Sequence, residues 1–159
     1  MHGLMQHAEL TLDRLLTHAA RWHGNTQIAS RSADGVTTHT DYATVTRRAH
    51  QVSNALRAEG TNKDDRVGTM GWNGYQHFEA WYGTIGIGAI CHTLNPRLLN
   101  DQIAYLVNHA EDRILLVDKA CRDILEEILP QCPSVEHIIF FDEVSPTPIT
   151  GSDLPVTGY

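Results

Sequence analysis

The chain has 159 residues, of which 42% are hydrophobic, and its 12 Lys and Arg against 19 Asp and Glu give a formal net charge of −7. This length suits one domain that buries about 70% of its unfolded surface, which excludes disordered and low-complexity classes. An acidic chain without a dense Lys/Arg cluster does not suit a phosphate backbone, so no nucleic-acid partner is expected.

No membrane span is expected, because the longest charge-free stretch, residues 80–96, is interrupted by glycines and too polar to cross a bilayer. The first residues lack the basic start and the apolar run of a signal peptide. The three cysteines form no C-x-x-C pair and are an odd number. Together these features predict a reducing, cytoplasmic location.

The N-terminal part of the chain predicts a short helix and a β-hairpin. Apolar residues follow the helical period over residues 12–22, with Thr11 as the expected N-cap and Gly24 beyond the end. Residues 27–31 and 36–40 flank the turn sequence Ala33-Asp34-Gly35, which is typical of a hairpin.

Helices and strands then alternate along the chain. The predicted elements are a helix opened by Thr40 and ended by Gly60, strand 66–70, helix 73–87, strand 89–93, a helix capped by Asn100, strand 114–117, helix 121–128 and strand 138–141. Parallel strands need crossover helices, so the predicted fold class is α/β, a mostly parallel sheet with helices on both faces.

The composition divides the chain at about residue 143. Residues 1–143 carry the predicted elements and are expected to form one N-terminal α/β subdomain. Residues 144–159 are rich in Pro, Gly, Ser and Thr and are expected to be a linker.

Three glycines, Gly83, Gly86 and Gly88, have the spacing of a phosphate loop in reverse order. Because they lie late in a predicted helix and at its exit, close packing of this helix on the sheet is the favoured interpretation. The sequence has no P-loop motif.

Two other candidate sites favour structural interpretations. His18 and His23 lie on different faces of the first helix and have no metal-ligand spacing, which indicates surface histidines. Cys91-His92 could form a thiol site only if a base folded against the cysteine, and a small buried cysteine in a strand is the favoured interpretation.

Trp72, His77 and Trp81 are candidates for lining an apolar acyl pocket, although aromatic residues at helical spacing most often form core. Asn73 is expected to be the N-cap of its helix. Asn95-Pro96-Arg97 is typical of a turn in which Arg97 holds the loop or a nearby carboxylate.

The order of these motifs is more specific than any one of them. Thr40-Asp41-Tyr42, Asp65-Arg66-Val67 and Trp72-Asn73 precede Gly83, Gly86 and Gly88-Ala89, and His92 to Leu98 and Asn108 to Asp112 follow. Over about residues 10–143 this resembles the N-terminal part of acyl-CoA synthetases in the AMP-binding, adenylate-forming superfamily. It is most similar to bacterial medium- and long-chain fatty-acid CoA ligases. One departure is Asp64, where the superfamily usually has Gly.

The resemblance implies a parent enzyme that uses ATP, Mg²⁺ and coenzyme A to convert a fatty acid through an acyl-adenylate into acyl-CoA. The family's nucleotide-binding motifs would follow this segment, so no residue here receives a catalytic, cofactor-binding or metal-binding role. Asn73, Gly86, Gly88, Asn95, Pro96 and Arg97 are interpreted as structural motif residues. The fragment alone is expected to be inactive and to bind no cofactor.

Alternatives remain open. The parent could act on another carboxylic acid, aryl or sulfur-containing, because the acyl pocket is built largely from downstream residues. The chain could be a stand-alone interaction module without catalysis. The expected partner is the remainder of the same polypeptide, and residues 7–21 could pair with a second copy as a homodimer.

Overall fold

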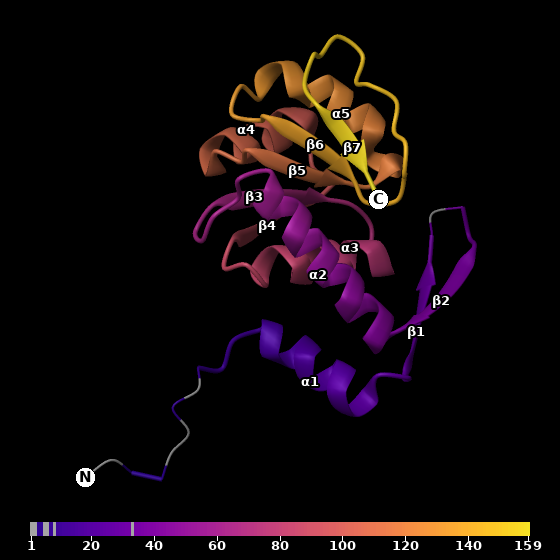
Figure 1. Ribbon diagram of the computed structural model, residues 1–159. Helices are drawn as coiled ribbons and strands as arrows, with labels where there is room; N and C mark the ends of the chain where they lie inside the picture. The colour runs from indigo at the N-terminus through magenta and orange to yellow at the C-terminus, as the bar shows by residue number, and fades with distance from the viewer. Residues whose placement is uncertain (1–2, 5–6, 8, 33) are drawn as a thin grey trace.

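The computed structural model describes residues 3–4, 7, 9–32 and 34–159. Helix α1 (Asp13–His23) is followed by strands β1 (Gln27–Arg31) and β2 (Thr37–Asp41), which pair antiparallel as a hairpin. The hairpin is therefore confirmed, while Ala33 of its expected turn lies outside the described residues. Helix α1 and the hairpin lie at one end of the molecule (Figure 1).

The rest of the chain alternates between helices and strands, as the sequence predicts. The elements are α2 (Tyr42–Ala58), β3 (Arg66–Met70), α3 (Tyr75–Ile85), β4 (Ile90–Leu94), α4 (Asn100–Ala110), β5 (Ile114–Val117), the short 3-10 helix η1 (Lys119–Cys121), α5 (Arg122–Ile128), a second, η2 (Leu129–Gln131), β6 (His137–Phe140) and β7 (Val156–Gly158).

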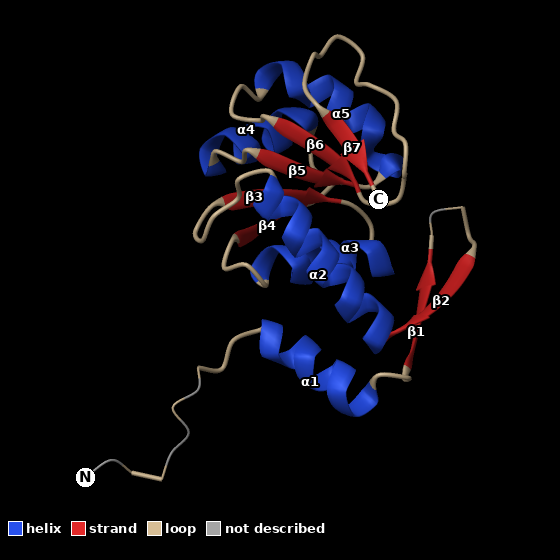
Figure 2. Cartoon of the chain, viewed as in Figure 1, coloured by secondary structure: helices blue, strands red, loops and turns tan. Residues whose placement is uncertain are grey.

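Five strands form one parallel sheet in the order β4-β3-β5-β6-β7 (Figure 2). Strand β3 lies between β4 and β5. The chain therefore forms β4 on one side of β3 and then crosses over to form β5 on the other side. This reversal of direction is the kind of switch point at which open α/β sheets bind ligands, beyond the carboxyl ends of their strands. The predicted α/β class is confirmed.

The sheet has a separate apolar core on each face. Alternating residues of the strands, such as Leu115 and Val117, pack with α4 and α5, and their neighbours Ile114 and Leu116 pack with α2 and α3. All four residues of β5 are buried, as expected for a central strand of a parallel sheet. Figure 1 shows the two pairs of helices on opposite sides of the sheet.

Four predicted helix N-caps are each wrong by one position. Asp41, not Thr40, caps α2, because its side-chain oxygen accepts from the amide of Thr44 at 2.7 Å. The other N-caps are Leu12, Gly74 and Leu99 in place of Thr11, Asn73 and Asn100. None of these three N-cap residues makes a side-chain capping hydrogen bond. At the start of α3 a tertiary contact takes that role, because Ser30 of the hairpin accepts from the amide of Tyr75 at 3.0 Å.

The glycines of α3 do not serve the close packing on the sheet that the sequence suggests. A Cβ at Gly83 would lie 2.6 Å from Cβ of Val52 and 2.9 Å from the carbonyl oxygen of Ala49, so this glycine brings α3 against α2. Gly88 has φ +80° in the turn before β4, and Asp64, which hydrogen-bonds to the carbonyl of Gly88, has φ 69°. Asp64, which stands where the superfamily usually has Gly, therefore has left-handed backbone geometry.

The prediction that residues 144–159 form a linker needs a correction at its end. Residues 156–158 form β7, which pairs with β6 as a further strand of the sheet. Ile149 is buried in the core on the α4 and α5 face. Buried His137 places Nδ1 2.9 Å from Oε2 of Glu59 and Nε2 3.0 Å from Oγ1 of Thr157, which ties β6 to α2 and to β7. A three-residue strand carries too little periodicity to be recognised locally.

Gly83→Ala should destabilise the fold by about 2 kcal/mol, because the added methyl group overpacks the contact between α2 and α3. Urea unfolding followed by circular dichroism measures this loss. The matched control is Gly3→Ala, since a Cβ at Gly3 meets nothing within 4 Å. Equal unfolding free energies for the two variants would show that the helices tolerate the methyl group.

Candidate functional site

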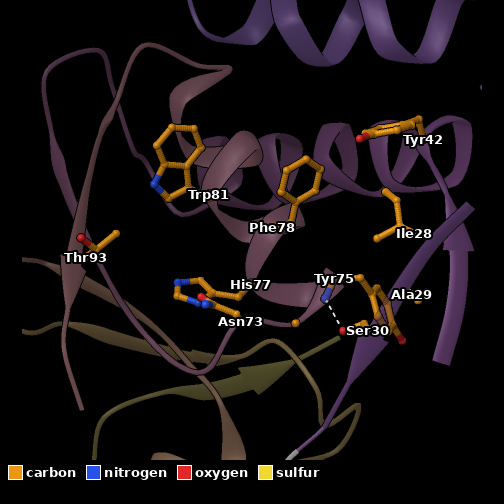
Figure 3. A pocket seen from close by; sticks show the side chains of 11 residues that line it. Ile28, Ala29, Ser30, Tyr42, Asn73, Tyr75, His77, Phe78, Trp81 and Thr93 are labelled. Atoms are coloured by element: carbon orange, nitrogen blue, oxygen red, sulfur yellow. Dashed lines mark hydrogen bonds between the residues drawn. The ribbon is translucent and has the colours of Figure 1, made fainter. Parts of the chain in front are cut away.

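An apolar cavity of about 480 Å³ opens between the hairpin, the first turns of α3 and the end of β4. Figure 3 shows the aromatic side chains of Phe78 and Trp81 on α3 and Tyr42 at the start of α2 around it. Ile28 of β1 completes the apolar wall, and Thr93 of β4 lies on the opposite side in the same view. Residues from four elements, far apart in the sequence, therefore build one site.

A second cavity of about 470 Å³ lies beside the first, at the carboxyl ends of β3 and β4. Both cavities are lined by Asn73, His77 and Thr93. The second is more polar and contains the loop after β4, with Asn95 and Arg97. The site therefore joins an apolar compartment to a polar one.

His77 holds the loop after β3 through a hydrogen bond. Because a carbonyl oxygen can only accept, Nδ1–H of His77 donates to the carbonyl of Trp72 at 3.1 Å. The ring stacks on Phe141 with centroids 5.4 Å apart, and Nε2 is buried without a partner among the described residues. Burial lowers the pKa of His77, which the Trp72 carbonyl opposes, so the neutral ring is favoured.

Arg97 gives the second cavity its positive charge. Its guanidinium lies over the ring of Trp72, 5.3 Å from the centroid, and its amide donates to Oδ1 of Asn95 at 3.0 Å. No carboxylate lines this cavity, within the part of the chain that the structure describes. In a chain of net charge −7 such a lining favours an anionic group, a carboxylate or a phosphate.

The structure brings together most of the residues that the sequence singles out. The three acyl-pocket candidates, Trp72, His77 and Trp81, all line the joined cavities, and so do four of the motif residues, Asn73, Asn95, Pro96 and Arg97. The predicted cap Asn73 is instead an exposed residue of the cavity wall. Gly86 and Gly88 lie at the far end of α3, away from the cavities.

Sequence reasoning misses the hairpin's contribution to the site. Ile28 and Ser30 come from β1, and Tyr42 from the start of α2, more than thirty positions before α3 along the printed sequence. The local signal of Ile28 and Ser30 is alternation within a short strand, which says nothing about which element the strand will cover, and Tyr42 is marked only as the start of a helix. Thr93 was likewise placed in a strand without any indication of the cavity.

Cys91 and His92 do not form a thiol site with each other. They are neighbours on β4, so their side chains point to opposite faces of the sheet. Nδ1 of His92 lies 2.7 Å from Oδ2 of the fully buried Asp112, while Cys91 contacts Thr69. Burial raises the pKa of the Cys91 thiol to about 11, which favours the unreactive protonated form.

The described residues offer no group of three or more His, Cys, Asp or Glu side chains that could hold a metal ion. Gly83 and Gly86 of the reversed glycine motif face α2, and Gly88 faces Lys63, so the three glycines form no single loop. Within the same described part, no helix is long and apolar enough to cross a membrane.

Comparison with known proteins identifies the family of the chain. Residues 15–155 match the model of the AMP-binding enzyme family. The chain belongs to this family. The resemblance seen in the sequence is therefore confirmed, and the match extends over the hairpin and both helical layers and ends at the residue before β7.

Among curated relatives of this AMP-binding chain, a long-chain-fatty-acid CoA ligase of Thermus thermophilus is 40% identical over 142 residues, which cover 89% of the chain and 26% of the relative. A 3-methylmercaptopropionyl-CoA ligase of Ruegeria lacuscaerulensis is 35% identical over 173 residues, 98% of the chain and 32% of the relative. The chain thus spans about a third or less of these relatives.

A solved structure, an anthranilate CoA ligase in complex with anthranoyl-AMP, resembles the fold with a TM-score of 0.71. The similarity covers 86% of this chain and 26% of the ligase, at 22% sequence identity. The α/β arrangement described above is therefore shared with this ligase.

Native Cys91 should react with iodoacetamide about a hundredfold more slowly at pH 8 than in the unfolded chain, because its raised pKa leaves little thiolate. Burial also raises the pKa of Cys121 to about 12 and of Cys132 to about 11. Mass spectrometry of timed alkylation measures the rates, with the denatured chain as control. Equal native and denatured rates at Cys91 would show a reactive thiolate.

Acid should weaken the fold partly through His77. The pKa of His77 is lower in the folded than in the unfolded chain. Its contribution to the unfolding free energy is therefore present above the unfolded pKa and is lost as the pH falls toward the folded pKa. Between about pH 7 and about pH 5, His77→Gln should therefore lose less unfolding free energy than the wild type. The control for the loss of a histidine is His50→Gln at an exposed position. A His77→Gln variant whose unfolding free energy falls with acid as steeply as that of the wild type would contradict the assignment.

Proposed function

We propose that this chain is the N-terminal α/β part of an ATP-dependent, AMP-forming acyl-CoA ligase that acts on fatty acids. The observation that carries the proposal is the match of residues 15–155 to the AMP-binding family, together with 40% identity to a long-chain-fatty-acid CoA ligase. In the parent reaction a carboxylate attacks the α-phosphate of ATP and releases pyrophosphate. The thiol of coenzyme A then attacks the acyl carbon and displaces AMP.

The joined cavities give this segment a part in substrate binding. Trp72, His77 and Trp81 would contact the acyl chain or the loop that holds it, with the apolar wall of the first cavity excluding water. Arg97 would attract an anionic group of a substrate in the second cavity. The neutral His77 keeps the Trp72 carbonyl fixed between the two compartments.

The adenylation chemistry itself is assigned to the remainder of the polypeptide, which is the expected partner of this segment. The described residues contain no group of three or more His, Cys, Asp or Glu side chains that could hold a metal ion, and Gly83 and Gly86 of the reversed glycine motif face α2. The segment alone is therefore proposed to be inactive. ATP, Mg²⁺ and coenzyme A are proposed as requirements of the longer enzyme.

A second candidate is a ligase for a short sulfur-containing carboxylic acid. The 35% identity to a 3-methylmercaptopropionyl-CoA ligase, over 98% of the chain, favours it specifically. The apolar cavity suits a thioether as well as an alkyl chain, because both are nonpolar and polarizable. The choice between the two acids therefore belongs to a substrate assay.

The 159-residue chain should catalyse no ATP–pyrophosphate exchange above background with any acid, whereas a longer polypeptide that contains it should show exchange that depends on a fatty acid. Labelled pyrophosphate incorporated into ATP measures both reactions. Dodecanoate, 3-methylmercaptopropionate and benzoate serve as the panel of acids. Exchange by the 159-residue chain would overturn its inactivity, and a preference for 3-methylmercaptopropionate would replace the fatty-acid assignment by the second candidate.

A further inference from the structure

The ring of Phe141 lies at the edge of the sheet from which the loops of the site leave. Phe141 directly follows β6 and is 2% exposed, and its amide donates to the carbonyl of Val117 at 3.1 Å. Strand β5 separates β6 from β3 in the sheet. The Phe141 side chain nevertheless contacts the segment that follows β3, and it does so at two places.

Gly71, the first residue after β3, is the first of these contacts. A Cβ at Gly71 would lie 2.5 Å from Cζ of Phe141 and 3.0 Å from Cβ of Asp118. Close-packed atoms do not approach that closely, so the missing side chain is what lets the ring lie against the backbone here. The next two residues of the same loop, Trp72 and Asn73, line the polar cavity.

His77 is the second contact. Its ring stacks on the ring of Phe141, with 5.4 Å between the centroids and 14° between the planes. The hydrogen bond from Nδ1 of His77 to the carbonyl of Trp72 holds one atom of the imidazole, and the stack sets the plane of the ring. Phe141 therefore contacts both ends of residues 71–77, a segment that supplies walls to both cavities.

The neighbouring Phe140 is as deeply buried but packs on the other face of the sheet. It belongs to the apolar core with α4 and α5, and the guanidinium of Arg122 lies 4.5 Å from the centroid of its ring. Phe141 belongs to the core with α2 and α3. A core position requires only an apolar side chain, whereas the contacts with Gly71 and His77 require a flat ring at residue 141.

We propose that Phe141 is a positioning residue of the joined cavities and acts through Gly71 and His77. Its ring holds residues 71–77 in the position that joins the apolar compartment to the polar one. Phe141 is buried by residues of this chain, so its role does not depend on what covers the outer surface in a longer polypeptide. Only the kinetic consequence of this role rests on the proposed function.

NMR of the 159-residue chain with labelled histidines tests the contact in the wild type. The His77 signal is identified among the ten histidines as the one missing from His77→Gln. The ring protons of His77 should show nuclear Overhauser effects to the ring of Phe141, and its nitrogens should report one tautomer, with hydrogen on Nδ1. Absence of these Overhauser effects would overturn the proposal before any variant is made.

Phe141→Leu keeps an apolar side chain but removes the ring. His77 should then populate both tautomers, and its pKa should rise toward the ordinary value, because water reaches the imidazole while the Trp72 carbonyl and Asp118 still favour the charged form. Phe140→Leu makes the same change at the adjacent buried residue and should leave the His77 signals as in the wild type. Equal His77 spectra in the two variants would contradict the proposal.

Gly71→Ala tests the other contact, because the added methyl group should displace the ring and so change the His77 signals. In the Phe141→Leu background the same methyl group should have a smaller effect, since leucine has no Cζ atom. Additive effects would refute the action of Phe141 through Gly71. Circular dichroism first confirms that each variant is folded, and Phe141→Met with Phe140→Met replaces the leucine pair if Phe141→Leu is not.

Kinetics of a longer polypeptide that contains the chain test the consequence for the site. Phe141→Leu should raise KM for the acid that the wild type uses about tenfold, with a smaller change in kcat, because the loop that joins the two cavities is displaced. A merely structural role would lower the folded fraction, and therefore kcat, and would leave KM unchanged. Expected His77 spectra with an inactive wild-type polypeptide would refute the proposed function alone.

Discussion

The parallel pairing of β3 with both β4 and β5 is the constraint on which the rest of the structure depends. Because β3 is flanked by the two strands that follow it, the loops after β3 and β4 leave the same edge of the sheet side by side. Trp72 and Asn73 come from the first loop, and Asn95 and Arg97 from the second. The polar cavity exists because the strand order brings these two loops together.

The hairpin and α3 complete what the sheet begins. The amide of Tyr75 donates to Ser30, so the hairpin is fixed to the start of α3 and closes one side of the apolar cavity. Gly83 allows α3 to approach α2 closely, which holds Phe78 and Trp81 on the cavity side of the helix layer. A small change at the α2–α3 contact would therefore reach the site through the position of α3.

Buried charges are paired within this framework. Fully buried Glu79 accepts two hydrogen bonds of 2.8 Å from Nε of Arg48, which joins α3 to α2. Burial raises the pKa of Glu79, and Arg48 opposes that shift by stabilising the charged form. The arginine also lies 5.7 Å from the ring centroid of Tyr159, so the segment after β7 is attached to the same layer. The pair fixes the relation of the helices to the end of the chain.

The sequence by itself determined the type and order of most elements and the family, because helical and strand periods and short motifs are local properties. It did not determine the helix caps, β7 or the cavity. Gly74 can start α3 because Ser30, forty-five positions before Tyr75, accepts from the Tyr75 amide, and β7 forms because β6 offers an unpaired edge. Only the tertiary structure could decide these features, since each depends on a contact between segments whose local sequences carry no signal of one another.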